Sequence, residues 1–166
     1  MKNALRHLSS FIAPIVMCFV LPYLIVWFEH QSPVPSVTPS IGLLIAGLAI
    51  GLIGLVLFIT TIRMFILIGN GTTMPWDPTR RLVVVSLYCY VRNPMILSLI
   101  ILQVGEAILF ASYGIAVLAI LNFVINTIYF IFSEEPGLEK RFGAEYIEYK
   151  KNDLRWIPRL KPWRPT

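Results

Sequence analysis

The fold is decided by one stretch of sequence, PMILSLIILQVGEAILFASYGIAVLAILNFVINTIYFIF, which occupies residues 94–132. It contains a single charged residue, Glu106, and a short polar connection at Ser112-Tyr113-Gly114. The connection separates two apolar runs, 94–111 and 113–132, and an α-helix of either length covers most of the ~30 Å hydrocarbon core of a bilayer. We therefore predict a membrane-embedded helical hairpin. Pro94 suits its first turn, where the missing N–H has no partner to lose.

Two more apolar runs precede the hairpin, at residues 11–28 and 41–67, and only Arg63 interrupts them. With 57% hydrophobic and 14% charged residues, the composition excludes a disordered chain, a collagen-like chain and most soluble globular domains. We predict an all-α polytopic membrane protein, a single membrane domain over residues 1–166. It has four transmembrane helices and a cytoplasmic amphipathic C-terminal helix. The first run lacks a small-residue cleavage site after it, so we expect a retained helix and not a signal peptide.

The basic residues indicate the topology. All fourteen Lys and Arg fall in the N-terminal end, the segment from Arg63 to Arg92 and the C-terminal tail, which four spans place on one side. The positive-inside rule makes that side cytoplasmic. We predict an integral membrane protein with both termini and the polar segments cytoplasmic, in the plasma or inner membrane of a prokaryote or the endoplasmic reticulum of a eukaryote.

The remaining composition gives little support for other partners. Topology accounts for the basic balance, so we expect no nucleic acid. Cys18 and Cys89 lie in different settings, one apolar and one polar, and we expect no disulfide between them. Neither cysteine has metal-site spacing, and His7 and His30 are isolated, so we expect no metal.

Small and polar residues inside the apolar runs predict helix contacts. Gly47, Gly51 and Gly54 form a small face that lets another helix approach closely, although glycine is also common in membrane helices. Glu106 is either structural, pairing with Asn122 or Asn126 across the hairpin, or it serves a substrate or ion.

The polar segments, 69–93 and 133–166, carry the chemistry. Glu134 and Glu135 end the last apolar run, where they either cap the following helix or hold a cation. Arg92 precedes a helix start, where the helix dipole disfavours a cation, so it either faces an anion such as Glu134 or Glu135 or only sets the topology. The tail then repeats apolar residues at helical spacing, with Gly143 marking a bend. These residues are Leu138, Phe142, Tyr146 and Tyr149.

An ordered set of short motifs runs through these segments. It comprises Gly71-Thr72-Thr73-Met74-Pro75, Leu82-Val83-Val84-Val85-Ser86-Leu87-Tyr88, Arg92-Asn93-Pro94-Met95-Ile96, Glu134-Glu135-Pro136-Gly137-Leu138, Phe142-Gly143-Ala144-Glu145-Tyr146-Ile147-Glu148-Tyr149 and Trp156-Ile157-Pro158. The set covers about residues 69–160 and resembles the isoprenylcysteine carboxyl methyltransferase / phospholipid methyltransferase family of membrane enzymes. Two positions depart from the family pattern: Ser86 replaces a glycine, and Ile96 replaces a tyrosine of the cofactor pocket.

The resemblance implies S-adenosylmethionine as cofactor, bound at the cytoplasmic face. Glu134 would hold its amino group, since a partly desolvated carboxylate binds ammonium and sulfonium groups well. The implied cofactor-binding residues are Thr73, Arg80, Arg81, Leu82, Val83, Tyr88, Asn93, Pro94, Met95, Ile96 and Glu134. Arg92 and Glu135 are the implied catalytic pair: Arg92 would bind the cofactor carboxylate or an acidic substrate, and Glu135 would accept the proton of an amine acceptor.

The resemblance implies a membrane methyltransferase that acts on a lipophilic small-molecule or prenylated acceptor, with membrane lipid as its environment. Because the sequence offers no histidine or evident base at this site, we expect an enzyme most like an isoprenylcysteine carboxyl O-methyltransferase. A phosphatidylethanolamine-type phospholipid N-methyltransferase is the alternative. Two other classes stay open: a small four-helix transporter that uses Glu106, and a sterol-type reductase relative with a nicotinamide cofactor. Ile96 also leaves room for a divergent substrate or an inactive relative.

Overall fold

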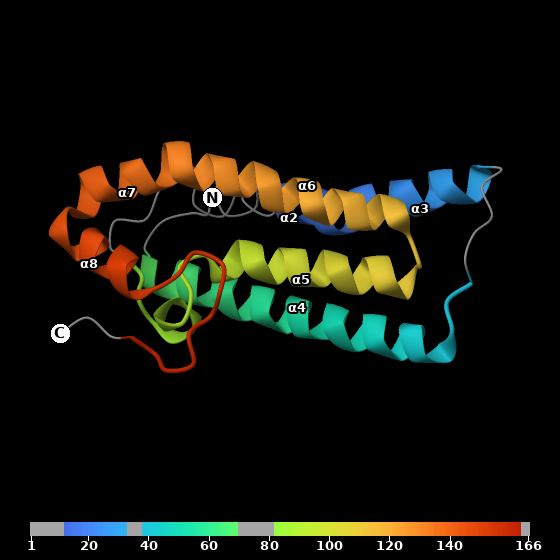
Figure 1. Cartoon of the computed structure of the whole chain (residues 1–166), viewed down its shortest axis with the longest axis horizontal. Coiled ribbons are helices and arrows are strands. Elements are labelled where there is room, and N and C mark those ends of the chain that lie inside the picture. Colours follow the sequence, from blue (N-terminus) through green and yellow to red (C-terminus); the bar gives the residue numbers. More distant parts are fainter. Residues whose placement is uncertain (1–11, 33–37, 70–81, 164–166) are drawn as a thin grey trace, which may run out of the picture. The chain divides into compact units, whose positions relative to one another are not determined.

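The computed structural model describes residues 12–32, 38–69 and 82–163, and within these ranges the chain is helical with no β-strand (Figure 1). This confirms the predicted all-α class. The helical elements are α2 (Ile12–Ile15), a π-helical stretch η1 (Val16–Val20), α3 (Leu21–Gln31), α4 (Ile41–Gly69), a 3₁₀ turn η2 (Ser86–Cys89), α5 (Pro94–Leu109), α6 (Tyr113–Tyr129), a π-helical stretch η3 (Phe130–Glu134), α7 (Glu135–Phe142) and α8 (Ala144–Asn152).

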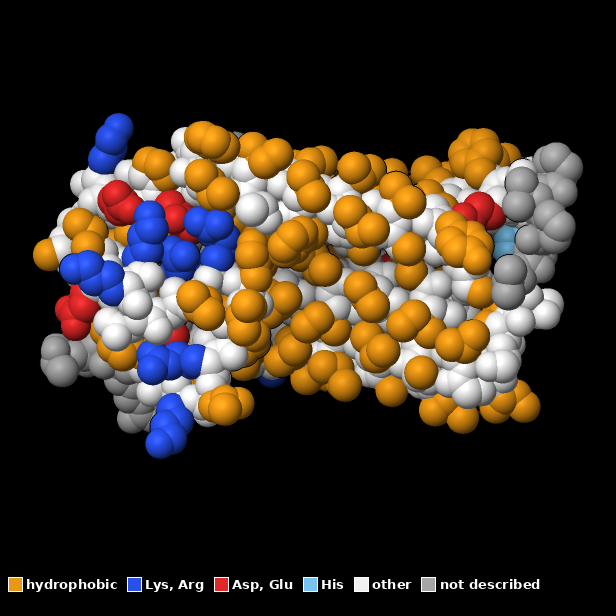
Figure 2. All heavy atoms as spheres, in the orientation of Figure 1, with side chains coloured by type: hydrophobic (Ala, Val, Ile, Leu, Met, Phe, Trp, Pro, Cys, Tyr) orange, Lys and Arg blue, Asp and Glu red, His pale blue; other side chains and the backbone are white. Residues whose placement is uncertain are grey.

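Two helices are long and apolar enough to cross a membrane, Ile41–Met64 within α4 and the continuous helix Tyr113–Phe142 that begins with α6. The apolar part of the second ends at Phe132, and its charged residues start at Glu134. Many side chains of both helices are exposed and hydrophobic (Figure 2). Two shorter apolar helices, Val16–Gln31 and Pro94–Leu109, accompany them. The structure thus provides two candidate spans, and crossing by the other two helices stays a prediction.

The described chain divides into two compact units. The first contains the residues up to Leu57 together with Ser98–Val124, and the second contains Phe58–Leu97 together with the chain from Ile125 onward.

In the first unit, glycines let the backbones of α4 and α5 touch. A Cβ atom added at Gly54 would lie 2.5 Å from the backbone N of Leu102, and one added at Gly47 would lie 2.5 Å from that of Leu109. A Cβ at Gly105 would collide with the backbone of Gly51. The predicted small face is therefore confirmed as a helix contact, and Gly105 of the facing helix completes it.

The hairpin turn of this unit is closed by side-chain caps. The Ser112 hydroxyl accepts a hydrogen bond from the backbone N–H of Ile115 at 3.1 Å, in the first turn of α6. The Glu29 carboxylate accepts the N–H of Gly114 at 2.9 Å, as expected for an anion at a helix N-terminus. Two of the otherwise unpaired N–H groups of α6 are thereby satisfied.

Polar side chains within the first unit form a second contact between its helices. Gln103 is fully buried; its amide nitrogen donates to the Met17 carbonyl and its oxygen accepts from the Asn122 amide, both at 3.0 Å. Such contacts hold membrane helices together at modest energy. Glu106, the other candidate partner of Asn122, has one carboxylate oxygen buried without a hydrogen bond from any described residue.

In the second unit, α7 and α8 fold onto the segment before α5. Val84, Cys89, Tyr146 and Tyr149 form a buried core, against which Leu82, Tyr90, Leu138, Phe142 and Trp163 pack. The chain can turn because Gly143 has φ +54° and ψ −127°, a conformation that side chains strongly disfavour. The predicted bend is confirmed: the apolar repeat of the tail is carried by two helices, not one.

Replacing Gly54 with alanine should destabilise the protein, because the new methyl group meets the α5 backbone, which cannot rotate away. We expect a loss of about 1–3 kcal/mol, the usual effect of overpacking. Thermal unfolding of the purified protein in detergent measures it.

Gly42→Ala is the matched control, since a Cβ there meets only the Ser40 hydroxyl at 3.9 Å. Alanine is the better helix former, so this variant should keep or raise the unfolding temperature. Equal behaviour of the two variants would refute the close contact of α4 with α5.

Candidate active site

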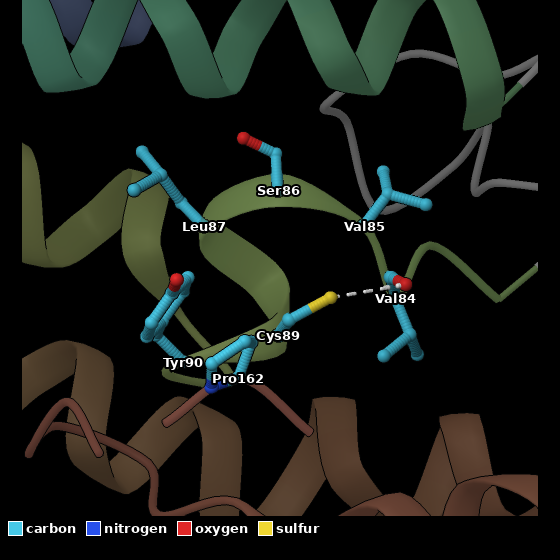
Figure 3. A pocket seen from close by; sticks show the side chains of 7 residues that line it. All are labelled: Val84, Val85, Ser86, Leu87, Cys89, Tyr90 and Pro162. Atoms are coloured by element: carbon cyan, nitrogen blue, oxygen red, sulfur yellow. Dashed lines mark hydrogen bonds between the residues drawn. The ribbon is translucent and has the colours of Figure 1, made fainter. Parts of the chain in front are cut away.

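The second unit contains a pocket beside the 3₁₀ turn η2. Its volume is about 560 Å³, and Figure 3 shows the lining side chains, which come from the segment before α5 and from the end of the chain. The lining residues are Val84, Val85, Ser86, Leu87, Cys89, Tyr90 and Pro162. The Cys89 thiol donates to the Val84 carbonyl at 3.4 Å, which braces the turn from inside. The wall is mostly apolar and suits an aromatic or aliphatic group.

Ser86 gives this turn an unusual backbone. Its φ is +52°, in the left-handed region that favours glycine. This is the position where the resemblance noted from the sequence has a glycine. Glycine would adopt this conformation freely, whereas it costs an L-residue about 1–2 kcal/mol.

A short C-terminal strap, residues 153–163, lies against the same segment. Its backbone makes three hydrogen bonds with the chain around η2: Leu154 O accepts from Arg92 N at 3.0 Å, Arg159 N donates to Tyr90 O at 2.9 Å, and Trp163 N donates to Cys89 O at 2.8 Å. The strap thus fixes one wall of the pocket and contributes Pro162 to it.

Tyr149 joins α8 to the same segment. Its hydroxyl donates to the Tyr88 carbonyl at 2.6 Å, and its ring stacks on that of Trp163. Burial raises the pKa of Tyr149, and the nearby Asp153 carboxylate raises it further, so the phenol keeps its proton and the hydrogen bond. Burial likewise raises the pKa of Tyr88.

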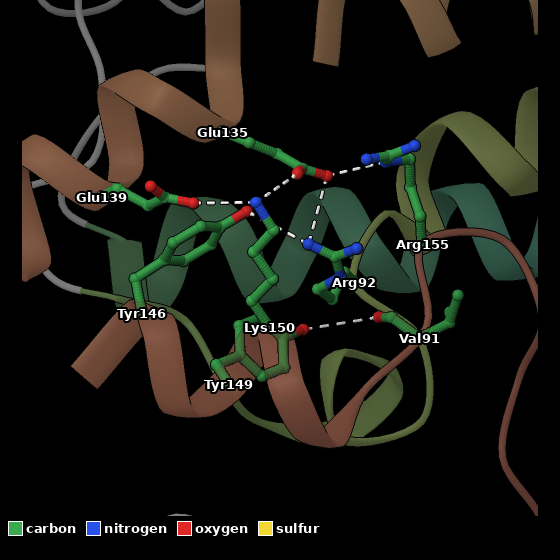
Figure 4. A network of polar contacts seen from close by, with 8 residues as sticks. All are labelled: Val91, Arg92, Glu135, Glu139, Tyr146, Tyr149, Lys150 and Arg155. Atoms are coloured by element: carbon green, nitrogen blue, oxygen red, sulfur yellow. Dashed lines mark hydrogen bonds and ion pairs between the residues drawn. The ribbon is translucent and has the colours of Figure 1, made fainter. Parts of the chain in front are cut away.

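A charged network centres on Glu135, the first residue of α7 (Figure 4). Its carboxylate Oε1 lies 3.1 Å from Nη1 of Arg92 and 2.6 Å from Nε of Arg155, and its Oε2 lies 3.1 Å from Nζ of Lys150. Lys150 also pairs with Glu139 at 2.8 Å. Three cations from three separate segments therefore meet one buried carboxylate.

The network determines the charge of Glu135. Burial acts to raise its pKa, but the hydrogen bond from Arg155, the Arg92 guanidinium and the hydrogen bond from Lys150 outweigh burial, and the pKa is lowered. Glu135 is therefore an anion at neutral pH and a poor proton acceptor. Burial raises the pKa of Tyr146, next to Arg92, to about 12, so this phenol stays neutral.

Arg92 retains a free donor. Its side chain is 9% exposed, and its Nε is buried with no hydrogen-bond partner among the described residues. A buried guanidinium N–H without a partner costs free energy, which an anionic ligand would recover.

Glu134 differs from its neighbour. It ends the π-helical stretch η3 and is half-buried. Burial raises its pKa to about 7, with Arg141 acting to lower the pKa and Glu135 to raise it. Two adjacent carboxylates thus have opposite pKa shifts, a pattern common where they serve different roles.

All described residues of the predicted site lie in the second unit. Val83, Tyr88, Pro94 and Glu135 are buried, and Leu82, Arg92, Asn93, Met95, Ile96 and Glu134 are half-buried. Arg92 meets Glu135, one of the anions that the sequence proposed for it. Thr73, Arg80 and Arg81 lie outside the described residues.

Sequence reasoning missed Lys150 and Arg155, which complete the network, and the pocket residues next to the predicted ones. The signal for Arg155 was present but weak, a cation beside the aromatic end of the chain. No group of three His, Cys, Asp or Glu that suits a metal ion occurs in the described part of the chain.

Fold and site define a small helical protein with candidate membrane spans and a polar, partly buried site in its second unit. Residues 43–145 match the phospholipid methyltransferase family, and this match covers more than half of the chain. The chain belongs to this family of integral membrane methyltransferases. No curated protein and no solved structure matches it.

Replacing Glu135 with glutamine should destabilise the second unit, because three cations lose the charge that compensates them. Breaking a buried ion pair on one side costs about 3 kcal/mol or more. Glu139→Gln is the matched control, since Glu139 is 38% exposed and its ion pair contributes no more than about 1 kcal/mol. Thermal unfolding in detergent compares the variants, and equal unfolding temperatures would contradict the central role of Glu135.

The same network predicts acid sensitivity. The folded pKa of Glu135 is lowered, so its contribution to stability is present above the ordinary carboxyl pKa, about 4.3, and is lost as the pH falls through the folded value. Unfolding temperatures recorded from pH 7 down to 3 should fall more for the wild type than for Glu135→Gln.

Proposed function

We propose that the protein is an S-adenosylmethionine-dependent methyltransferase with a lipophilic acceptor, most like the isoprenylcysteine carboxyl O-methyltransferases. The observation that carries the proposal is a pair of adjacent carboxylates at the start of α7, in a chain of a methyltransferase family. Glu135 forms ion pairs with cations, and the pKa of Glu134 lies near 7.

The described residues fit the charged groups of this cofactor. Glu134 offers a carboxylate to the amino group, and the unpaired Nε–H of Arg92 offers a donor to the carboxylate. By resemblance, Leu82, Val83, Tyr88, Asn93, Pro94, Met95 and Ile96 line the site, with Thr73, Arg80 and Arg81 at its edge. When bound, the cofactor supplies a methyl group activated by a sulfonium.

The chain's own residues would bind, orient and exclude water. Glu135 holds Arg92 in place through their 3.1 Å ion pair, so it is a positioning residue more than a proton acceptor. The strap, through Arg155 and Pro162, covers the same region. Methyl transfer to a positioned nucleophile needs mainly proximity and orientation, which such residues supply.

The acceptor is proposed to be a carboxylate, as in a prenylated cysteine. An ionised carboxylate needs no base, whereas an amine must first lose a proton. Three cations hold Glu135, and Glu134 is assigned to the cofactor, so neither carboxylate at the start of α7 is available as a base for an amine. A phospholipid amine is the second candidate, because the matched family is named for phospholipid methylation.

The proposal includes the topology inferred from sequence: one membrane domain with four spans, and both termini and the site on the cytoplasmic side. The two candidate spans and the clustered basic residues support it. A transporter or a sterol-type reductase is less well supported, because the chain belongs to a methyltransferase family.

S-adenosylhomocysteine should bind the purified protein in isothermal calorimetry, and Glu134→Gln should weaken binding about tenfold or more, since a hydrogen bond to a charged group contributes about 1.5–3 kcal/mol. Wild-type affinity should rise with pH through about 7 as Glu134 loses its proton, and the variant should lack this dependence. The exposed Glu145 supplies the matched control, Glu145→Gln. No binding, or equal binding by Glu134→Gln, would refute the cofactor site.

The chemical class of the methyl acceptor can be identified from the stability of the methylated product in alkali. Given methyl-labelled cofactor, a farnesylcysteine derivative and phosphatidylethanolamine, we expect label in a methyl ester, which alkali hydrolyses to volatile methanol. An N-methylated phospholipid keeps its label in alkali. Alkali-stable label would overturn the carboxylate acceptor in favour of the amine, while leaving the cofactor proposal intact.

A further inference from the structure

The C-terminal strap, residues 153–163, exposes a row of large apolar side chains. Leu154, Ile157 and Leu160 recur every third residue, with 59%, 66% and 99% of their surfaces exposed. Aliphatic side chains this exposed are unfavourable in water and indicate a surface that something else covers.

The row cannot turn inward, because the other side of the strap is already engaged. Asp153 is buried, the ring of Trp156 packs 5.6 Å from that of Phe130, and Arg155 binds Glu135. Backbone hydrogen bonds at Leu154, Arg159 and Trp163 tie the strap to the chain around η2. The fold therefore holds the apolar row outward.

Cations flank the row. Lys151 and Lys161 are exposed, whereas Arg159, about one-third exposed, lies 3.7 Å from the buried Asp153, the acid of the strap. Figure 2 shows Lys and Arg side chains gathered over α7, α8 and the strap. Exposed aliphatic and basic side chains in one short segment are typical of segments that lie on anionic membranes.

The position of the strap in its unit points to the same partner. Arg155 lies 2.6 Å from Glu135, only three residues beyond Phe132, where the apolar part of the membrane-spanning helix ends. The strap is thus anchored at the level where that helix would leave the bilayer, so a lipid surface is always within reach.

We propose that the strap docks on the anionic lipid surface of the bilayer. Leu154, Ile157 and Leu160 enter the boundary between headgroups and acyl chains, while the exposed Lys161 binds lipid phosphate. Since the strap carries Arg155 and Pro162, docking also steadies the Glu135 network and one wall of the pocket. Anionic lipid is on this view a structural partner, whatever the acceptor.

A probe at position 160 tests the proposal in the full chain. Leu160→Cys is labelled with an environment-sensitive fluorophore, with Cys18 and Cys89 protected by burial, and placed as one copy per nanodisc. We compare phosphatidylcholine discs with discs containing about 30% phosphatidylglycerol, a content that makes the surface negative. Blue-shifted emission and quenching by spin-labelled lipid are expected only in the anionic discs.

Charge variants sharpen the test. Lys161→Gln should lower the ratio of inserted to solvated probe about fivefold, the effect of removing one cation from an anionic surface. Lys140→Gln, on the exposed face of α7, is the matched control and should leave the ratio unchanged. A probe that stays in water in anionic discs, inserts equally in neutral ones, or shifts only with two copies per disc would overturn the proposal. Methyl transfer is not the readout, so failure here leaves the proposed function untouched.

Discussion

One buried carboxylate organises the second unit. Glu135 binds Arg92 from the segment before α5, Lys150 from α8 and Arg155 from the strap, so one side chain ties together three parts of the chain. Burying an isolated charge is expensive, and the arrangement is stable only when its partners are present together. The strap, α8 and the pocket segment therefore depend on each other through this network as well as through the apolar core around Tyr146 and Tyr149.

Much of the fold could be predicted because its causes are local. Long apolar runs predicted the helices at 41–67, 94–111 and 113–132 within a few residues of α4, α5 and α6 with η3. Gly143 marked a break because no other residue adopts its backbone conformation easily. Arg92 was expected either to face an anion or only to set the topology, and it pairs with Glu135, one of the acids proposed for it.

Other parts of the site depend on contacts that no local pattern encodes. Lys150 and Arg155 look like ordinary surface cations, and only the turn at Gly143 and the return of the strap bring them to Glu135. Ser86 shows the opposite case. The resemblance puts a glycine at this position, and the φ of +52° at Ser86 lies in the region that favours glycine, so the serine leaves strain in the backbone of the turn.

The pair Glu134 and Glu135 shows how one fold can give adjacent identical side chains different tasks. Glu135 lies among three cations and stays charged, so its role is to hold other residues in place. Glu134 is one residue away, but burial outweighs the attraction of Arg141, and its proton is lost only near neutrality. A bound cation would stabilise the charged form of such a carboxylate strongly, because the cations of the protein do not fully balance its burial. Glu135 engages Arg92, Lys150 and Arg155, and in the proposed cofactor site this leaves Glu134 for a positively charged ligand.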